Sequence, residues 1–171
     1  TRVLVTVIGL AGIFYVSQQG WRRINENSWL LRAARTKNSW QQKTDALKQA
    51  HQTEPGNFET TYEIGETLRL ASWRGEDNYE ALATEALKWF ELGTSLNPYD
   101  PYNHLRYGMC LHWLGKHEEA APHVQRAVAM DRNSYYLAAH EGWHWVQMGN
   151  YPEAQRAFER SLHLKWWDNP L

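Results

Sequence analysis

The segment that decides the fold is Leu114-Gly115-Lys116-His117-Glu118-Glu119-Ala120, because it returns in similar form 34 residues later. The second copy reads Met148-Gly149-Asn150-Tyr151-Pro152-Glu153-Ala154. Gly108 and Gly142 agree at the same offset. A fixed period of this length predicts stacked copies of one supersecondary unit.

The matched glycines have distinct roles. Gly115 and Gly149 are suited to end a helix, because glycine adopts a positive φ at little cost. Gly108 and Gly142 leave room for two helices of one unit to approach closely. We therefore predict one helical hairpin in each of two adjacent repeats, 101–134 and 135–168.

This pattern resembles the tetratricopeptide repeat (TPR) family, whose unit is a helical hairpin of the same length. A distorted earlier unit is predicted over 57–100, where Gly65, Ala86 and Phe90 take equivalent places. Nine residues are inserted between its two helices, relative to the later repeats. We expect them either to extend the helices or to form a protruding loop.

No segment shows sustained alternation of apolar and polar residues, so strands are not expected. The predicted fold class is all-α, a TPR-like α-solenoid of about four helical hairpins, preceded by an N-terminal transmembrane helix. Three or more stacked repeats are needed to bury a continuous core, and four hairpins satisfy that requirement.

Charge is distributed unevenly along the 171 residues. The formal net charge is −1, yet residues 1–50 carry +6 and residues 51–171 carry −7. The near-neutral total argues against a generic nucleic-acid binder. A basic segment followed by an acidic body instead indicates contact with an anionic surface near the N-terminus. The single cysteine, Cys110, excludes an internal disulfide and predicts a small buried side chain.

The N-terminal segment is apolar. Val3 to Val16 contains fourteen residues without a charge, whereas a full membrane span needs about 20. The chain opens without Met, so we expect it to be processed, truncated or renumbered, with room for apolar residues upstream. Residues 1–20 are predicted to be the C-terminal part of a transmembrane helix, followed by a basic juxtamembrane helix and a degenerate first hairpin over 21–56. The residues expected at the membrane interface are Trp21, Arg22 and Arg23.

Two other interpretations of this N-terminus stay open. It could be an uncleaved signal peptide, although no A-x-A-like cleavage site follows Val16. It could also be a buried helix of a soluble domain.

One motif suggests metal chemistry. His140-Glu141-Gly142-Trp143-His144 matches the H-E-x-x-H signature of zinc peptidases, in which both histidines face one side of a helix. However, Gly142 is also the packing glycine of the repeat. We therefore predict a repeat helix with no metal and no cofactor, and keep a zinc peptidase using His140, Glu141 and His144 as a remote alternative.

The TPR resemblance also implies a binding groove, lined by the first helix of each unit. Peptide-binding TPRs that clamp a C-terminal carboxylate place Lys, Asn and Arg there, whereas this chain has Leu105 and Met109. The resemblance therefore implies a mainly apolar and aromatic groove. Its expected residues are Tyr62, Arg69, Tyr102, Leu105, Met109, His112, Trp113, Tyr136, Trp143 and Val146. The alternative is that these aromatic side chains pack against a neighbouring repeat or another part of the same protein.

The whole chain resembles the C-terminal TPR region of bacterial O-antigen ligase/polymerase membrane proteins. The stretches that carry this resemblance are Leu70-Ala71-Ser72-Trp73-Arg74-Gly75-Glu76-Asp77-Asn78-Tyr79, Leu96-Asn97-Pro98-Tyr99-Asp100-Pro101-Tyr102-Asn103, Leu105-Arg106-Tyr107-Gly108-Met109-Cys110-Leu111 and His140-Glu141-Gly142-Trp143-His144-Trp145-Val146-Gln147. That family transfers or polymerises lipid-linked glycans with loops between membrane helices. Those loops are not in this sequence, so the resemblance implies a non-catalytic region at the bacterial inner membrane.

The sequence thus predicts a membrane-tethered TPR scaffold that binds a protein or peptide partner in its groove and membrane lipid through its N-terminal helix. Its repeats are expected in an aqueous compartment, on a side of the membrane that the sequence does not specify. Nucleic acid is not expected as a partner. An alternative is a single-span accessory subunit that assembles a larger membrane complex.

Overall fold

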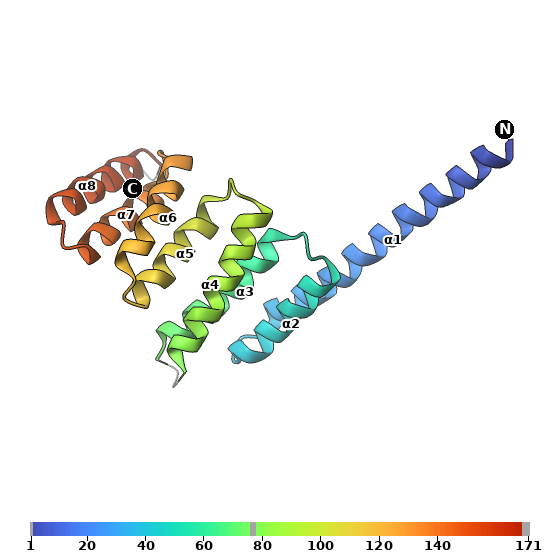
Figure 1. The fold of residues 1–171 in the computed structure, drawn as a ribbon, viewed down its shortest axis with the longest axis horizontal. Helices are drawn as coiled ribbons and strands as arrows, with labels where there is room; N and C mark the ends of the chain where they lie inside the picture. The colour runs from blue at the N-terminus through green and yellow to red at the C-terminus, as the bar shows by residue number, and fades with distance from the viewer. Residues whose placement is uncertain (1, 76–77, 169–171) are drawn as a thin grey trace. The chain divides into compact units, whose positions relative to one another are not determined.

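The computed structural model describes residues 2–75 and 78–168, with the side chains of 166–168 excepted. The described part of the chain contains helices and connecting turns but no strand. The chain divides into two compact units, Thr1–Thr60 and Thr61–Leu171. The prediction of an all-α solenoid is confirmed. The helices, labelled in Figure 1, are α1 (Arg2–Arg35), α2 (Trp40–Thr53), α3 (Phe58–Trp73), α4 (Tyr79–Leu96), α5 (Pro101–Trp113), α6 (His117–Met130), α7 (Tyr135–Gln147) and α8 (Tyr151–Asp168).

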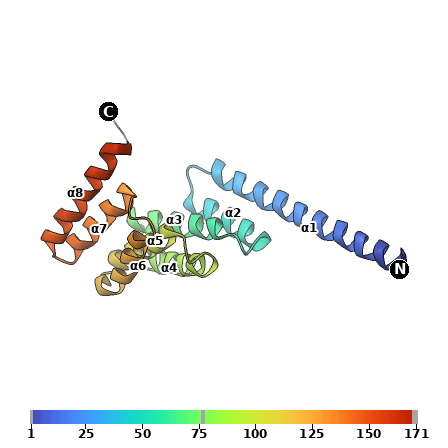
Figure 2. The same ribbon diagram turned by 90° about the horizontal axis from the view of Figure 1, so that it is seen from above.

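The first unit is a hairpin of α1 and α2. Figure 2 shows that the N-terminal half of α1 extends past the end of α2. The predicted span and the predicted juxtamembrane helix are one continuous α-helix of 34 residues, which is about 51 Å long at 1.5 Å per residue. Only its C-terminal half contributes buried residues, Glu26 and Ala33.

Glu26 fixes the register of α1 within this unit. Its side chain is buried, and its carboxylate accepts a hydrogen bond of 2.6 Å from Asn57 Nδ2. Asn57 Oδ1 in turn accepts from the backbone N–H of Glu59 at 3.0 Å, so the same side chain caps the start of α3. The buried carboxyl group therefore has a hydrogen-bond partner, as burial of a polar group requires.

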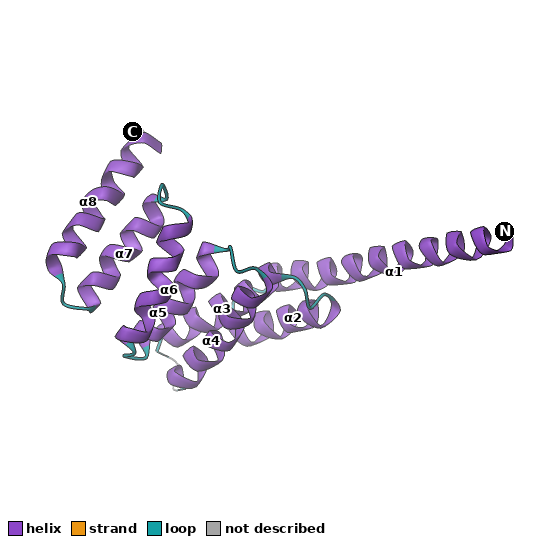
Figure 3. Cartoon of the chain, turned by 45° about the horizontal axis from the view of Figure 1, so that its top comes forward, coloured by secondary structure: helices purple, strands orange, loops and turns teal. Residues whose placement is uncertain are grey.

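The second unit stacks the remaining helices in pairs, as the cartoon in Figure 3 shows. Local signals set the helix limits. Asp100 accepts from Asn103 N and Ser134 from Leu137 N, which caps the starts of α5 and α7. After α5, Gly115 has φ 73° and Lys116 N donates to Leu111 O at 2.9 Å. This is a Schellman ending.

The packing glycines allow the two helices of each hairpin to approach. A Cβ on Gly65 would lie 2.7 Å from the Phe90 ring, and one on Gly142 would lie 2.7 Å from the Phe158 ring. On Gly108 it would meet Val124 Cγ2 at 2.8 Å. The same close approach therefore occurs in three successive hairpins.

Most of the inserted residues lengthen the helices of the earlier unit. Helices α3 and α4 have 16 and 18 residues, whereas α5 and α6 have 13 and 14. Residues 76–77, within the predicted insertion, lie outside the described part of the chain. The extended end of α3 carries Trp73, which is 64% exposed.

Candidate functional site: a pocket between three helices

A pocket of about 500 Å³ opens between the first helices of three successive hairpins, α3, α5 and α7. This volume lies within the range of pockets that hold drug-sized ligands. Four of its ten lining residues are Trp or Tyr, and two arginines provide charge. The lining residues are Arg69, Leu70, Trp73, Arg106, Met109, Trp113, Tyr136, Ala139, His140 and Trp143.

Half of the predicted groove residues line this pocket: Arg69, Met109, Trp113, Tyr136 and Trp143. Three others lie outside its lining. Tyr102 is 41% exposed, and its ring lies 6.2 Å from that of Tyr136. Val146 is exposed, whereas Tyr62 is half-buried and pairs with Arg106.

The structure corrects the prediction for Leu105. Its side chain is fully buried in a cluster with Ala127, Val128 and Leu137. The physical reason is helix geometry, because this position of α5 faces the packed helices α6 and α7. The residue that faces the pocket is its neighbour, Arg106.

The prediction for His112 is also wrong. Its side chain is 4% exposed, and both of its ring nitrogens have partners. Nδ1 lies 2.9 Å from His117 Nδ1, and Nε2 lies 2.7 Å from His144 Nδ1. His112 supports the pocket only from behind, through an edge contact with the Trp143 ring at 5.1 Å.

The sequence-based groove prediction did not include Arg106, Trp73 or His140, and His140 was noted only as part of the H-E-x-x-H match. A signal was present, because Arg106 and His140 occupy the same position in their repeats, 34 residues apart. Met109 and Trp143 share another such position, and both line the pocket.

Two arginines at the pocket share one carboxylate. Arg69 makes two bonds to Glu66, of 2.7 and 2.8 Å, and Arg106 Nε lies 3.2 Å from Glu66 Oε2. Only 13% of each arginine side chain is exposed. Burial opposes the charge on Arg106, but Glu66 and Tyr62 outweigh that cost and raise its pKa. Arg106 therefore stays cationic.

His140 is neutral at pH 7 because burial, with the nearby charges of Arg106 and Arg69, lowers its pKa to about 4. Its ring lies edge-on to Tyr136 at 4.5 Å. It contributes an uncharged polar surface to the pocket wall.

The three side chains of the H-E-x-x-H motif have separate partners. His140 lines the pocket, His144 bonds to His112, and Glu141 forms a 2.6 Å ion pair with Arg160 on α8. No group of three His, Cys, Asp or Glu side chains among the described residues has an arrangement able to hold a metal ion. Cys110 is buried, and burial raises its pKa to about 12, so its thiol stays protonated.

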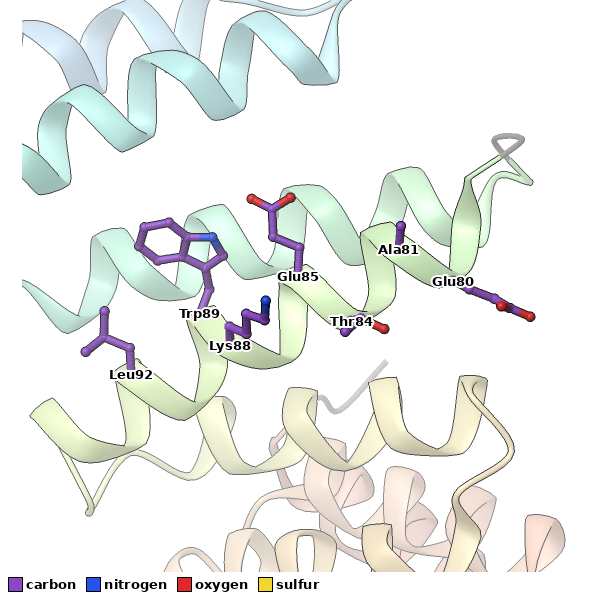
Figure 4. A pocket seen from close by; sticks show the side chains of 7 residues that line it. All are labelled: Glu80, Ala81, Thr84, Glu85, Lys88, Trp89 and Leu92. Atoms are coloured by element: carbon purple, nitrogen blue, oxygen red, sulfur yellow. The ribbon is translucent and has the colours of Figure 1, made fainter.

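A second depression lies on the surface of α4 (Figure 4). All of its lining residues come from this one helix: Glu80, Ala81, Thr84, Glu85, Lys88, Trp89 and Leu92. Two acids and one lysine give it a net negative charge. It therefore differs from the pocket in charge and in depending on a single helix.

Helix α1 has a long apolar exposed segment. Within the described residues it is the one helix long and apolar enough to cross a membrane, and none of the residues in its apolar window is buried. A signal sequence can have the same length and apolar composition. Trp21, Arg22 and Arg23 are exposed at the end of this segment.

No protein-family model matches the chain, and the comparison with curated proteins found no match. Solved structures do resemble it. A crystal structure of MamA has a TM-score of 0.67 and 20% identity, and covers 82% of this chain and 73% of its own. TTC0263, a thermophilic TPR protein of Thermus thermophilus, has a TM-score of 0.68 and 17% identity over 73% of this chain and 65% of its own.

A third similar structure is YrrB, described as a TPR protein with an unusual peptide-binding site. Its TM-score is 0.60 at 17% identity, over 74% of this chain and 60% of its own. At these identities the likeness concerns the fold alone. The chain therefore has the fold of a TPR-type α-solenoid.

Proposed function

We propose that this chain is a membrane-tethered scaffold that binds a protein or peptide partner in the pocket between α3, α5 and α7. The observation that supports this most strongly is the pocket itself, with three Trp, one Tyr and two Arg on its walls. These residue types supply most of the binding energy in protein interfaces. A pocket of this kind on a repeat fold favours an extended peptide or a helix as ligand.

The walls are held in place before any ligand arrives. Trp113 Nε1 donates to Ser72 Oγ at 2.8 Å, and Ser72 Oγ donates to Tyr79 O at 2.7 Å. Arg106 lies over the Tyr136 ring at 5.7 Å. Side chains that are already fixed lose little conformational entropy on binding, which supports a binding role.

A displayed library of random peptides, selected on the full chain in lipid nanodiscs, tests this function. We expect enrichment of peptides on the wild type and loss of that enrichment with Trp143→Ala. Trp89→Ala is the matched control, because Trp89 lies on α4 outside the pocket. Equal enrichment on wild type and Trp143→Ala would contradict the proposal.

The membrane tether is the second part of the proposal. Residues 1–20 form the span, 21–56 the basic first hairpin, and 57–100, 101–134 and 135–168 the three following units. The exposed apolar side chains of α1, with Trp21 and two arginines at their end, support this division. Such a surface needs lipid or protein cover.

Flotation with lipid vesicles tests the tether. Ile8→Lys should reduce the floating fraction strongly, because a lysine in the middle of a span costs about 3 kcal/mol. Ile24→Lys, at an equally exposed isoleucine beyond the interface residues, should float like the wild type. Equal flotation of all three proteins would contradict the tether, and release of a shortened chain would favour a signal peptide.

We also propose that the scaffold is the non-catalytic C-terminal region of an O-antigen ligase-like membrane protein. The sequence resemblance supports this context. The mass of the polypeptide in its native cells tests it. A chain much larger than the 20.1 kDa of this sequence, with several spans, would agree, whereas one of that mass would favour the accessory subunit.

A further inference from the structure

We infer that the pocket ligand is a peptide segment that presents an Asp or Glu side chain to Arg69 and Arg106, beside a bulky apolar side chain. This inference rests on the proposed function, because it names the chemistry of the peptide that the same pocket would take.

The first reason is an excess of positive charge. Arg69 and Arg106 both pair with the single carboxylate of Glu66. His140, on the wall beside them, is neutral at pH 7 because its pKa is about 4. The group therefore carries one unbalanced positive charge. A charge withdrawn from water is costly unless it is paired.

The second reason is that one nitrogen of Arg106 donates its hydrogen bond to a weak acceptor. Its Nη1 donates to the thioether sulfur of Met109 at 3.1 Å, and a thioether is a weak acceptor. Its Nε is divided between Tyr62 Oη at 3.3 Å and Glu66 Oε2 at 3.2 Å. A ligand carboxylate reaching this guanidinium would replace a weak hydrogen bond with a charge-assisted one.

The third reason concerns what surrounds the charge. Trp73, Trp113, Trp143 and Leu70 make apolar walls next to the two guanidinium groups. A small inorganic anion would leave these walls uncovered. A peptide with an acidic residue beside a large apolar one would pair with a guanidinium group and also cover the apolar walls.

An internal side chain fits better than a chain terminus, because aromatic surface continues at both ends of the pocket. Tyr102 is exposed beside Tyr136, and Trp73 is exposed at the extended end of α3. A peptide that continues past the arginines in both directions can use this surface, whereas a C-terminal residue can use only one side.

The test compares matched synthetic peptides on the full chain in nanodiscs. A peptide enriched from the random library is made with each Glu or Asp changed in turn to Gln or Asn, and also as the C-terminal amide. We expect at least one acid-to-amide change to weaken binding about tenfold or more, and amidation to have little effect. Binding of the acidic peptide should weaken as salt rises.

Two arginine variants show whether Arg106 is the residue that binds the acidic side chain of the peptide. Arg106→Gln should bind the acidic peptide and its amide analogue equally, which is the signature of a broken pairwise interaction. Arg156→Gln, an exposed arginine on α8 outside the pocket, should preserve the difference. If Arg106→Gln fails to fold, the comparison of acidic and amide peptides on the wild-type chain still tests the inference.

The outcomes separate the two proposals. Enriched peptides that bind equally well with every acid neutralised would overturn this inference and leave the peptide-binding function in place. Loss of binding on C-terminal amidation alone would overturn the internal side chain as the source of the carboxylate. A library that yields no binder would overturn the proposed function itself.

Discussion

The packed face and the pocket face of α5 lie side by side on one short helix, yet they are fixed by different forces. Leu105, Gly108 and Leu111 are buried against neighbouring helices. Arg106 and Met109, from the same two turns, line the pocket, and Arg106 contacts both the Met109 sulfur and the Tyr136 ring. Changes on the first face should therefore alter stability, whereas changes on the second should alter binding.

The largest expected effect is on the packed face. Leu105→Ala removes a fully buried side chain and should lower the free energy of unfolding by about 2–5 kcal/mol. Tyr102→Ala, three residues earlier and 41% exposed, should lower it by less than about 1 kcal/mol. Urea unfolding of the full chain measures both. Similar losses of unfolding free energy in the two variants would contradict the difference between the packed face and the pocket face.

Acid should lower the stability of the fold through two histidines, His112 behind the pocket and His140 on its wall. His112 and His140 have pKa values lowered to about 4, chiefly by burial, whereas an unfolded histidine titrates near 6.5. The unfolded chain therefore binds more protons between these values, so stability falls as the pH drops from about 6.5 to about 4. Each histidine should cost about 1–2 kcal/mol between pH 7 and pH 5.

His140→Gln makes the acid effect specific. This variant removes one titrating group, so its loss of stability between pH 7 and pH 5 should be smaller than that of the wild type. Urea unfolding at the two pH values measures the difference. An unchanged loss would show that His140 does not have a lowered pKa.

A smaller effect is expected at the turn after α5. Gly115 has φ 73° and open space around its Cα, so Gly115→Ala is strained by its backbone and not by contacts. The expected cost is about 1–2 kcal/mol. Gly20→Ala, within α1 and equally free of neighbours, should not destabilise the chain. A thermal midpoint for Gly115→Ala equal to that of the wild type would contradict the role of this turn.

The smallest effect is expected at the start of α7. Ser134 Oγ accepts from Leu137 N at 3.3 Å, and Ser134→Ala should cost about 1 kcal/mol. Peptide binding should change little, because Ser134 is not among the pocket residues. A large loss of binding would mean that the orientation of α7 depends on this cap.

The fold was predictable because its signals are local. The glycines at 108, 115, 142 and 149 each specify one contact or one turn, and the 34-residue offset repeats them. The continuity of α1 could not be derived in this way, because a change from apolar to basic residues alters the environment of a helix without ending it.

The pocket was only partly predictable. Repeat spacing selected the correct helices, but the rotation of α5 about its axis decides whether Leu105 or Arg106 faces the pocket. That rotation depends on packing against α6 and α7, which involves residues distant in sequence. The different surroundings of His140 and His144 also depend on contacts between residues distant in sequence, because His112 on α5 contacts only His144.

The most direct test of the central proposal is the affinity of a library-selected peptide for three forms of the full chain. We expect Trp143→Ala to bind about tenfold or more weakly than the wild type while keeping its helical circular dichroism and unfolding midpoint. Trp89→Ala should bind like the wild type. Equal affinity of the wild type and a folded Trp143→Ala protein would contradict the assignment of the pocket between α3, α5 and α7 as the binding site.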